Sequence, residues 1–183
     1  MILPEIGVFQ RGPLPTTRSF RQRGYSRIVF HKRSGGGNRF QGRRRGGGME
    51  VELVPIEWLK AHEEIRQKKV EELAKITKKW GCYTKPLLVD KRTGTILDGH
   101  HRHQVGFILN LLRLPVILFD YLEDESITVE AWPNCGLESL SKQEVLEMAA
   151  SDQLFPAKTS RHTTEWNTPP IHVSLETLAT TED

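Results

Sequence analysis

The six residues Asp98-Gly99-His100-His101-Arg102-His103 decide the local fold at the centre of this chain. Residues 86–90 and 95–97 come before them as short apolar runs joined by the turn 91–94, a pattern that predicts two paired strands. Residues 105–112 follow with apolar side chains at helical spacing, which predicts an amphipathic helix. The segment therefore joins a strand to a helix, where unpaired backbone N–H groups and the helix dipole favour an anion.

Several residues of this segment suit a phosphate group. Gly99 lets a ligand approach the backbone closely, and Arg102 offers a planar fork that matches phosphate oxygens. His100 and His101 can add imidazole N–H donors, whereas we expect His103 to face solvent or a neighbouring strand. A transition-metal site is disfavoured, because adjacent histidines on a turn rarely converge on one ion. The segment thus predicts a phosphate-binding turn.

Apolar spacing predicts two further helices. One covers residues 64–80 and ends at Gly81. Its apolar face consists of Val70, Leu73, Ile76 and Trp80. The other opens at Ser141 with a capping box and runs to about Ala150.

Strands are predicted on both sides of the central segment. The pattern favours a first strand at 51–55, followed by a short turn at 56–59. The continuous apolar run 115–119 indicates a buried strand, and the alternating segment 126–132 indicates another. Residues 155–183 are expected to be mostly loop, with a short turn around Leu175.

Charge is divided unevenly along the 183 residues, whose formal net charge is +3. Residues 1–48 contain ten arginines and one lysine against one acid, which gives +10 and leaves −7 for residues 49–183. The first part also holds ten of the fifteen glycines and no apolar periodicity. We therefore predict a disordered Arg/Gly-rich tail over 1–48 and a single domain over 49–183, long enough for its own core.

The tail has three possible explanations. Three glycines directly precede Met49, as a translated ribosome-binding site does when the start is misassigned, and we favour this explanation over Met1 as the true start. The other two are an inert solvated tail and an arm that binds nucleic-acid phosphates without sequence preference.

The rest of the composition indicates a cytoplasmic protein with no membrane partner. No apolar run approaches the roughly 20 residues that cross a bilayer. The first five residues lack the basic-then-apolar order of a secretion signal. Cys82 and Cys135 form no CxxC motif, so we predict free thiols rather than a disulfide framework or a zinc ribbon.

Four separated segments carry a resemblance to a known family. They are Ala61-His62-Glu63, the run 85–88 leading to 98–102, the pair Trp132-Pro133, and residues 155–162. In these segments, residues 50–180 resemble the free L-serine kinases, which include archaeal enzymes and a bacterial siderophore-pathway relative. The resemblance implies an α+β fold of the ParB/sulfiredoxin-like type, a small mixed sheet flanked by helices.

The resemblance also implies an activity and roles for residues. The family moves phosphate from a nucleotide to the hydroxyl of free serine, giving O-phosphoserine for sulfur or serine metabolism. It implies Glu63 as the catalytic acid/base. It also implies that nucleotide and product phosphates are bound by Gly99, His100, His101 and Arg102. Finally, it implies that the substrate serine is surrounded by Trp132, Lys158, Thr159, Ser160, Arg161 and His162.

The phosphoryl donor is less constrained than the acceptor. Several archaeal relatives carry a long insertion after the strand that ends at the tryptophan, where this chain has only residues 133–157. The contacts that such an insertion makes with the nucleotide are therefore in question. We expect ATP or ADP with Mg²⁺, and favour ATP.

Each assigned side chain also has an ordinary structural explanation. Glu63 can take the proton of a hydroxyl, or can complement the dipole of the following helix together with Glu64. Asp98 is predicted as a catalytic residue and Mg²⁺ ligand, or as a cap for the next helix, and these roles can coexist. Trp132 can belong to the core. The cationic loop 158–162 can be solvated, or can grip a carboxylate or phosphate.

Two other functions compete with the kinase. A ParB-like nucleotide- or DNA-binding protein or nuclease is disfavoured, because the single helix at 141–150 leaves no room for a helix-turn-helix module. The acidic balance of residues 49–183 also argues against DNA on the domain surface. Sulfiredoxin-like chemistry needs a cysteine in the turn, which has none. We therefore expect serine and a nucleotide as partners, and nucleic acid only through the tail.

Overall fold

The computed structural model describes residues 27–28 and 50–180. Its strands are β1 (Arg27–Ile28), β2 (Val51–Pro55), β3 (Cys82–Tyr83), β4 (Leu87–Asp90), β5 (Ile96–Asp98), β6 (Arg113–Phe119), β7 (Ile127–Ala131), β8 (Ser160–Thr164) and β9 (Val173–Ser174). Its helices are α1 (Gln67–Trp80), α2 (His100–Ile108), α3 (Lys142–Ala150) and α4 (Leu175–Ala179), with a 3-10 helix at Ile56–Trp58. Apart from β1, the predicted tail over residues 1–48 lies outside the described residues.

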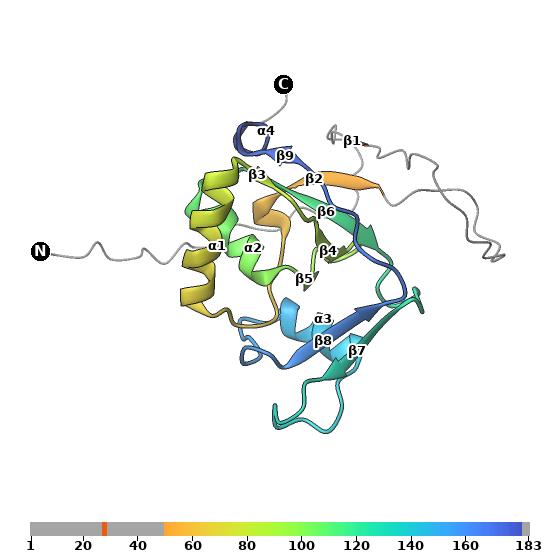
Figure 1. The fold of residues 1–183 in the computed structure, drawn as a ribbon. Helices are drawn as coiled ribbons and strands as arrows, with labels where there is room; N and C mark the ends of the chain where they lie inside the picture. The colour runs from red at the N-terminus through yellow and green to blue at the C-terminus, as the bar shows by residue number, and fades with distance from the viewer. Residues whose placement is uncertain (1–26, 29–49, 181–183) are drawn as a thin grey trace, which may run out of the picture.

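A five-stranded mixed sheet forms the centre of the fold (Figure 1). Its order is β1-β2-β6-β4-β5, in which β4 and β6 run parallel and the other neighbours run antiparallel. Six of the seven residues of β6 are buried, as expected for a central strand covered on both faces. This arrangement confirms the predicted α+β fold with a small mixed sheet.

Helices and two small ribbons surround this sheet. Figure 1 shows α1 and α2 side by side against the sheet, with α3 beside the antiparallel β7–β8 ribbon at the lower end of the view. The second ribbon, β3–β9, lies with α4 at the opposite end. No helix in residues 50–180 has the length and apolar character that crossing a bilayer requires.

The face of α1 differs from the prediction. The helix begins at Gln67, three residues later than expected, and ends as predicted at Gly81, whose φ is +68°. Its buried residues are Val70, Ala74 and Thr77. Ile76 and Trp80 are 43% and 57% exposed, because the smaller side chains occupy the stripe that packs on the molecule. The predicted face was therefore correct at Val70, partly correct at half-buried Leu73, and wrong at its other two positions.

The C-terminal segment is more ordered than predicted. Residues 155–183 were expected to be mostly loop, but they contain β8, β9 and α4. The polar sequence of β8 has no apolar alternation, and its order comes from pairing with β7 along its whole length. The short strand β3 was missed as well. Ser141 caps α3 with the predicted capping box, and both cysteines are free thiols.

Candidate active site

The segment 60–64 positions Glu63 between two distant parts of the chain. The Lys60 N–H donates to the carbonyl of Gly94, and the Lys60 carbonyl accepts from the Ile96 N–H. On the other side, the His62 carbonyl accepts from Phe155 N–H at 2.9 Å. These ladder-like bonds hold the segment in extended form before α1 begins, so Glu63 faces the loop before β8 rather than the first turn of α1.

The Glu63 carboxylate is surrounded by hydrogen-bond donors from that loop. Its Oε2 accepts from the N–H of Thr159 at 3.2 Å, from the N–H of Ser160 at 2.9 Å and from the Ser160 hydroxyl at 2.8 Å. Its Oε1 accepts from the N–H of Lys158 at 2.7 Å. Lys158 has a left-handed backbone with φ +70°, which lets three successive N–H groups converge on one anion.

His62, beside Glu63, connects the loop to the central turn. Its side chain is completely buried. Its Nε2 lies 2.8 Å from the Ser160 hydroxyl, and its Nδ1 lies 3.2 Å from Nε2 of His100. Burial lowers the pKa of His62 to about 4, although the charge of Glu63 opposes the shift. The pair Glu63–Ser160 is thus linked through a neutral histidine to the first residue of α2.

The histidines of the central segment have separate environments. Burial lowers the pKa of His100 well below its ordinary value, and the nearby His62 and His162 add to this effect. His101 accepts a hydrogen bond from the N–H of Arg66 at 3.2 Å. His103 is buried, with Nε2 3.4 Å from the carbonyl of Ile56, so of its two predicted environments, solvent or a neighbouring strand, solvent is wrong. Its ring packs against Phe107 on the same helix.

Gly99 is required at the start of α2. Its φ is +115°, and a Cβ atom there would lie 2.7 Å from the Leu87 side chain and 3.0 Å from Nη2 of Arg102. The glycine therefore permits both the backbone turn and the close approach of the guanidinium. The N-cap residue Gly99 has no side chain to cap the first N–H groups of α2, so these groups can serve an anion.

Asp98 forms ion pairs instead of capping α2. Its Oδ2 lies 3.0 Å from Nη2 of Arg102 and 3.2 Å from Nζ of Lys85. Burial raises the pKa of Asp98, but the charges and hydrogen bonds of Arg102 and Lys85 outweigh burial and lower it overall. The side chain is 46% exposed. The Arg102 Nε is buried without a hydrogen-bond partner among the described residues, so this guanidinium retains donor capacity.

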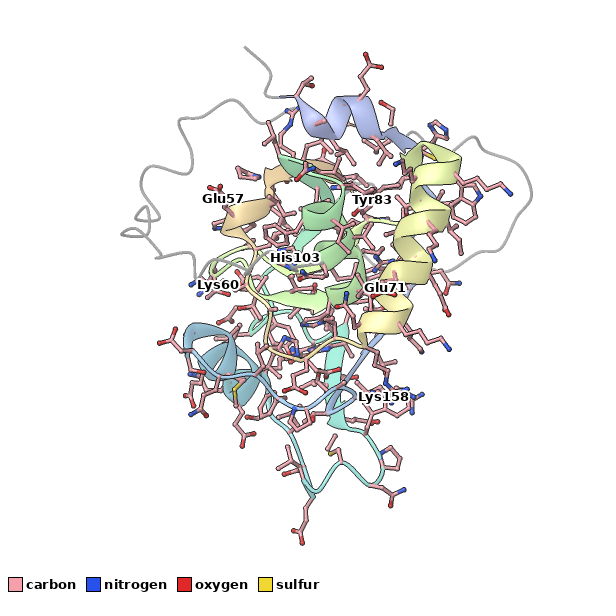
Figure 2. The ribbon with its side chains drawn as sticks, turned by 90° about the vertical axis from the view of Figure 1, so that its left-hand side faces the viewer. Glu57, Lys60, Glu71, Tyr83, His103 and Lys158 are labelled. Carbon is pink, nitrogen blue, oxygen red and sulfur yellow. The ribbon has the colours of Figure 1, made fainter. Side chains whose placement is uncertain are left out.

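Trp132 borders a pocket rather than filling the core. The pocket has a volume of about 380 Å³ and is lined by residues 132–135, after β7, and 156–159, before β8. Nζ of Lys158 and Cζ of Arg161 lie 5.5 and 5.2 Å from the centre of the half-buried Trp132 ring. Figure 2 shows Lys158 beyond the first turn of α1, away from α4. The pocket thus combines an aromatic wall with one lining cation, Lys158, while Arg161 lies over the same ring without lining the pocket.

The predicted loop residues 158–162 divide between this pocket and the interior. Thr159 is buried and its hydroxyl donates to the Pro156 carbonyl. His162 turns inward, where its Nε2 lies 2.8 Å from the Tyr121 hydroxyl and its ring centre lies 5.7 Å from that of His62. Burial lowers the pKa of His162 to about 3. Lys158 and Arg161 remain exposed.

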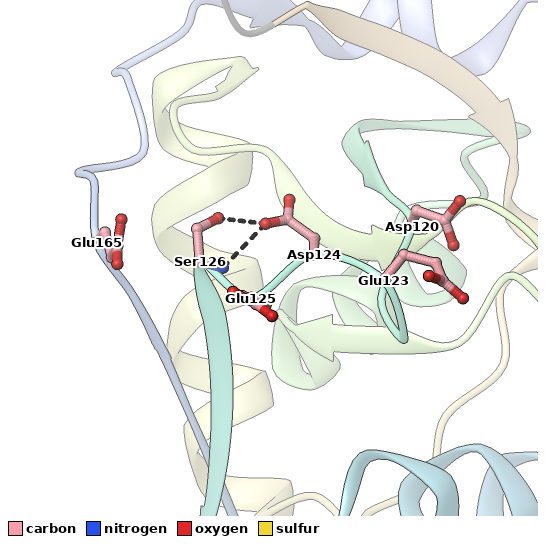
Figure 3. A pocket seen from close by; sticks show the side chains of 6 residues that line it. All are labelled: Asp120, Glu123, Asp124, Glu125, Ser126 and Glu165. Carbon is pink, nitrogen blue, oxygen red and sulfur yellow. Dashed lines mark hydrogen bonds between the residues drawn. The ribbon is translucent and has the colours of Figure 1, made fainter. Parts of the chain in front are cut away.

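A second pocket, of about 530 Å³, has the wrong charge for an anionic ligand. It is lined by Asp120, Glu123, Asp124, Glu125, Ser126 and Glu165 (Figure 3). Ser126 donates to Asp124 through its N–H and its hydroxyl, and Asp120 pairs with Lys91 and Arg92. Every charged side chain that lines this pocket is a carboxylate. The pocket therefore repels phosphates and is not the candidate site.

The structure therefore brings the predicted residues together in three linked groups. Glu63, His100, Ser160 and His162 gather around His62, Asp98 pairs with Arg102 beside Gly99, and Trp132 lies with Lys158 and Arg161. Sequence reasoning assigned no role to His62, Lys85 or Tyr121. The position of His62 directly before the predicted acid/base was the available signal.

Comparison with known proteins relates the chain to kinases of free serine. No family model matches. The chain is 28% identical over 98 residues to the ATP-dependent L-serine kinase of Staphylothermus marinus. This match covers 51% of this chain and 38% of the relative. It is 31% identical over 84 residues to the ADP-dependent L-serine kinase of Thermococcus kodakarensis, covering 44% of this chain and 34% of the relative. A ParB-like protein of Sulfolobus acidocaldarius is 35% identical over 83 residues, covering 45% and 41%.

Solved structures show the same architecture. A free serine kinase in complex with AMP matches with a TM-score of 0.62 at 19% identity, covering 69% of this chain and 92% of the other. C-terminally truncated SbnI from Staphylococcus aureus matches with a TM-score of 0.63 at 14% identity, covering 73% and 90%. In sequence, the matched region spans only 34–41% of the length of the three relatives. The chain thus has the fold of the free serine kinases and resembles ATP- and ADP-dependent L-serine kinases in sequence.

Proposed function

We propose that this protein phosphorylates the hydroxyl of free L-serine with a nucleotide, producing O-phospho-L-serine. The observation that carries the proposal is that the N–H groups of the loop 158–160 converge on the Glu63 carboxylate. His62 links this group to the turn at Gly99. These segments are far apart in sequence and all belong to those that resemble serine kinases. An anion-binding turn and a positioned carboxylate are what phosphoryl transfer to an alcohol requires.

Glu63 is the proposed general base. Its Oε2 is occupied by three donors, whereas among the described residues Oε1 accepts a hydrogen bond from the Lys158 N–H alone and keeps a lone pair for a further donor. In the proposed reaction the serine hydroxyl donates its proton to Oε1 while its oxygen bonds to the terminal phosphorus of the nucleotide. The bond from that phosphorus to the bridging oxygen breaks, and ADP leaves from ATP, or AMP from ADP.

The turn at Gly99 is the proposed phosphate site. The open N-terminus of α2, the Arg102 guanidinium and the second ring nitrogen of His101 can contact phosphate oxygens. His100 contributes differently from expectation, because its Nε2 is engaged by His62. Its backbone N–H, rather than its Nε2, is therefore the proposed donor to phosphate.

The pocket beside Trp132 is the proposed serine site. Lys158 and Arg161 supply two positive charges for the serine carboxylate, and the ring closes one side. The pocket includes Lys158 and Thr159, whose N–H groups bind Glu63, so a serine held there lies close to the proposed base.

Mg²⁺ fits this arrangement if the nucleotide supplies most of its ligands. Asp98 offers one half-exposed carboxylate, with Oδ2 shared by Arg102 and Lys85. Residues 50–180 contain no cluster of three side chains suited to a metal ion. Mg²⁺ often binds one or two carboxylates together with substrate phosphates, and it would neutralise phosphate charge here.

Three further parts of the proposal concern the whole chain. We propose residues 49–183 as the catalytic domain and residues 1–48 as a separate basic tail. ATP is the favoured donor, although similar proteins include both ATP- and ADP-dependent enzymes. We also propose a cytoplasmic location, where free serine and nucleotides meet, and a product that enters sulfur or serine metabolism.

The test is product analysis by mass spectrometry. The full-length protein is incubated with serine, Mg²⁺ and either ATP or ADP, and O-phosphoserine is measured against reactions without serine. We expect serine-dependent product with at least one nucleotide. Folded protein that forms none with either nucleotide contradicts the proposal. Salt-sensitive DNA binding that survives in a protein lacking residues 1–48 would support the ParB-like alternative instead.

A further inference from the structure

The contacts of the Ser160 hydroxyl fix the direction of a partly buried hydrogen-bond chain. This hydroxyl lies 2.8 Å from Oε2 of Glu63 and 2.8 Å from Nε2 of His62. The carboxylate already accepts three backbone N–H groups, so it acts as an acceptor. The single hydroxyl proton of Ser160 therefore points to Glu63, and Ser160 must accept its second bond from Nε2–H of His62.

The hydrogen-bond chain continues from His62 to the central turn. A neutral His62 that carries its proton on Nε2 has a lone pair on Nδ1. Nε2 of His100, 3.2 Å away, must then donate to that lone pair. Two weaker contacts compete with this arrangement. The His62 backbone N–H points at Nε2 of His100 at 3.5 Å, the long limit for a hydrogen bond, and the Ile96 carbonyl is a further acceptor near the His62 ring. The shorter contacts, at 2.8 and 3.2 Å, determine the arrangement. Each proton in the chain from His100 to Glu63 thus points toward the carboxylate.

We infer that His62 is a positioning residue for Glu63, acting through Ser160 and tied by His100 to the phosphate turn. His62 commits the Ser160 proton to Oε2, and this bond holds the carboxylate so that Oε1 faces the substrate. Ring contacts of His62 with His100, Phe155 and His162 leave it little freedom to rotate. The role in catalysis rests on the proposed kinase function, whereas the hydrogen-bond chain does not.

The chain is tested first without any activity measurement. Long-range ¹H–¹⁵N correlation spectra of the ¹⁵N-histidine-labelled full-length protein at pH 7 distinguish the two neutral tautomers, with variants at each histidine providing assignments. We expect the Nε2–H tautomer at both His62 and His100. An Nδ1–H tautomer at His62 would overturn the inference, even if the protein proved to have another activity.

Two matched variants then test the positioning role. In His62→Gln the amide nitrogen can still donate to Ser160, whereas in His62→Asn the shorter amide can accept from His100 but cannot reach Ser160. Loss of a hydrogen bond within a chain that ends on a charged group corresponds to about a ten- to hundredfold effect. We expect His62→Asn to lower kcat for O-phosphoserine by that factor, with the KM for nucleotide unchanged, and His62→Gln to stay closer to wild type.

The variant Ser160→Ala completes the design, because it keeps the backbone N–H that binds Glu63. If His62 acts through Ser160, adding His62→Asn to Ser160→Ala lowers kcat no further. Independent, multiplicative losses in the double variant, or equal kcat values in His62→Asn and wild type, would contradict the inference. If wild type makes no O-phosphoserine, the proposed function fails while the tautomer spectra still decide the chain.

Discussion

Replacing Gly99 by alanine tests the geometry of the proposed phosphate turn. Gly99 has φ +115°, and residues other than glycine are strained there by about 1–3 kcal/mol. The new Cβ would also lie 2.7 Å from the buried Leu87 side chain and 3.0 Å from the Arg102 guanidinium. Overpacking of this kind costs a further 1–3 kcal/mol or so. We therefore expect Gly99→Ala to lower the free energy of unfolding by about 2–6 kcal/mol.

Gly136 offers a matched control in the same chain. Its φ is +89°, but a Cβ atom there meets nothing within 4 Å. Gly136→Ala should show the backbone strain alone, so urea denaturation should find Gly99→Ala less stable by about 1–3 kcal/mol. Where Gly99→Ala remains folded, nucleotide binding should weaken as Arg102 is displaced. Equal destabilisation of the two variants, with unchanged nucleotide affinity, would refute the close packing described for the turn.

Three other perturbations test the chemistry of the site. Glu63→Gln should lower kcat by about 10²–10⁴ while nucleotide binding, measured by calorimetry, is retained; the exposed neighbour variant Glu64→Gln should keep wild-type kcat. Trp132→Ala releases Lys158 and Arg161, the proposed carboxylate ligands, from the ring. It should raise the KM for serine by about fivefold, the upper value of one exposed cation–π contact, without changing the KM for nucleotide; equal changes in both would contradict a serine-specific wall. Acidification should destabilise the fold, because burial lowers the pKa of His62 from 6.5 to about 4 and the unfolded chain therefore binds more protons in that window. The unfolding free energy should fall by about 3 kcal/mol between pH 6.5 and 4 on account of His62 alone, and a stability that stays flat over this range in urea titrations would contradict its neutral, buried state.

Local patterns in the sequence predicted much of the fold. The strand pair before Gly99, the helix after it and the capping box at Ser141 all depend on residues close to each other in the chain, and all are present. The bounds and face of that helix were wrong, however: α2 covers residues 100–108 instead of 105–112, and Ile108 and Leu112 are exposed. The exposed face of α1 shows where such patterns fail. Ile76 and Trp80 have helical spacing with Val70, but spacing alone does not say which of two overlapping stripes packs against the molecule.

Tertiary contacts explain what the sequence could not show. β8 is a polar strand that exists because β7 pairs with it, and no local signal marks that partner. The hydrogen bonds of Glu63 to residues near Ser160 and the contact of His62 with His100 cross long stretches of chain. The resemblance to serine kinases indicated which segments matter, whereas the hydrogen-bond chain through His62 required their positions in space.

The central proposal is that the Glu63 carboxylate takes the proton of a serine hydroxyl beside an anion-binding turn. The most direct measurement is ³¹P NMR of wild type and Glu63→Gln side by side, with nucleotide, Mg²⁺ and serine. We predict a phosphomonoester resonance of O-phosphoserine that grows only with wild type and only when serine is present. Equal rates in the two proteins, or nucleotide consumption that is independent of serine, would contradict the account.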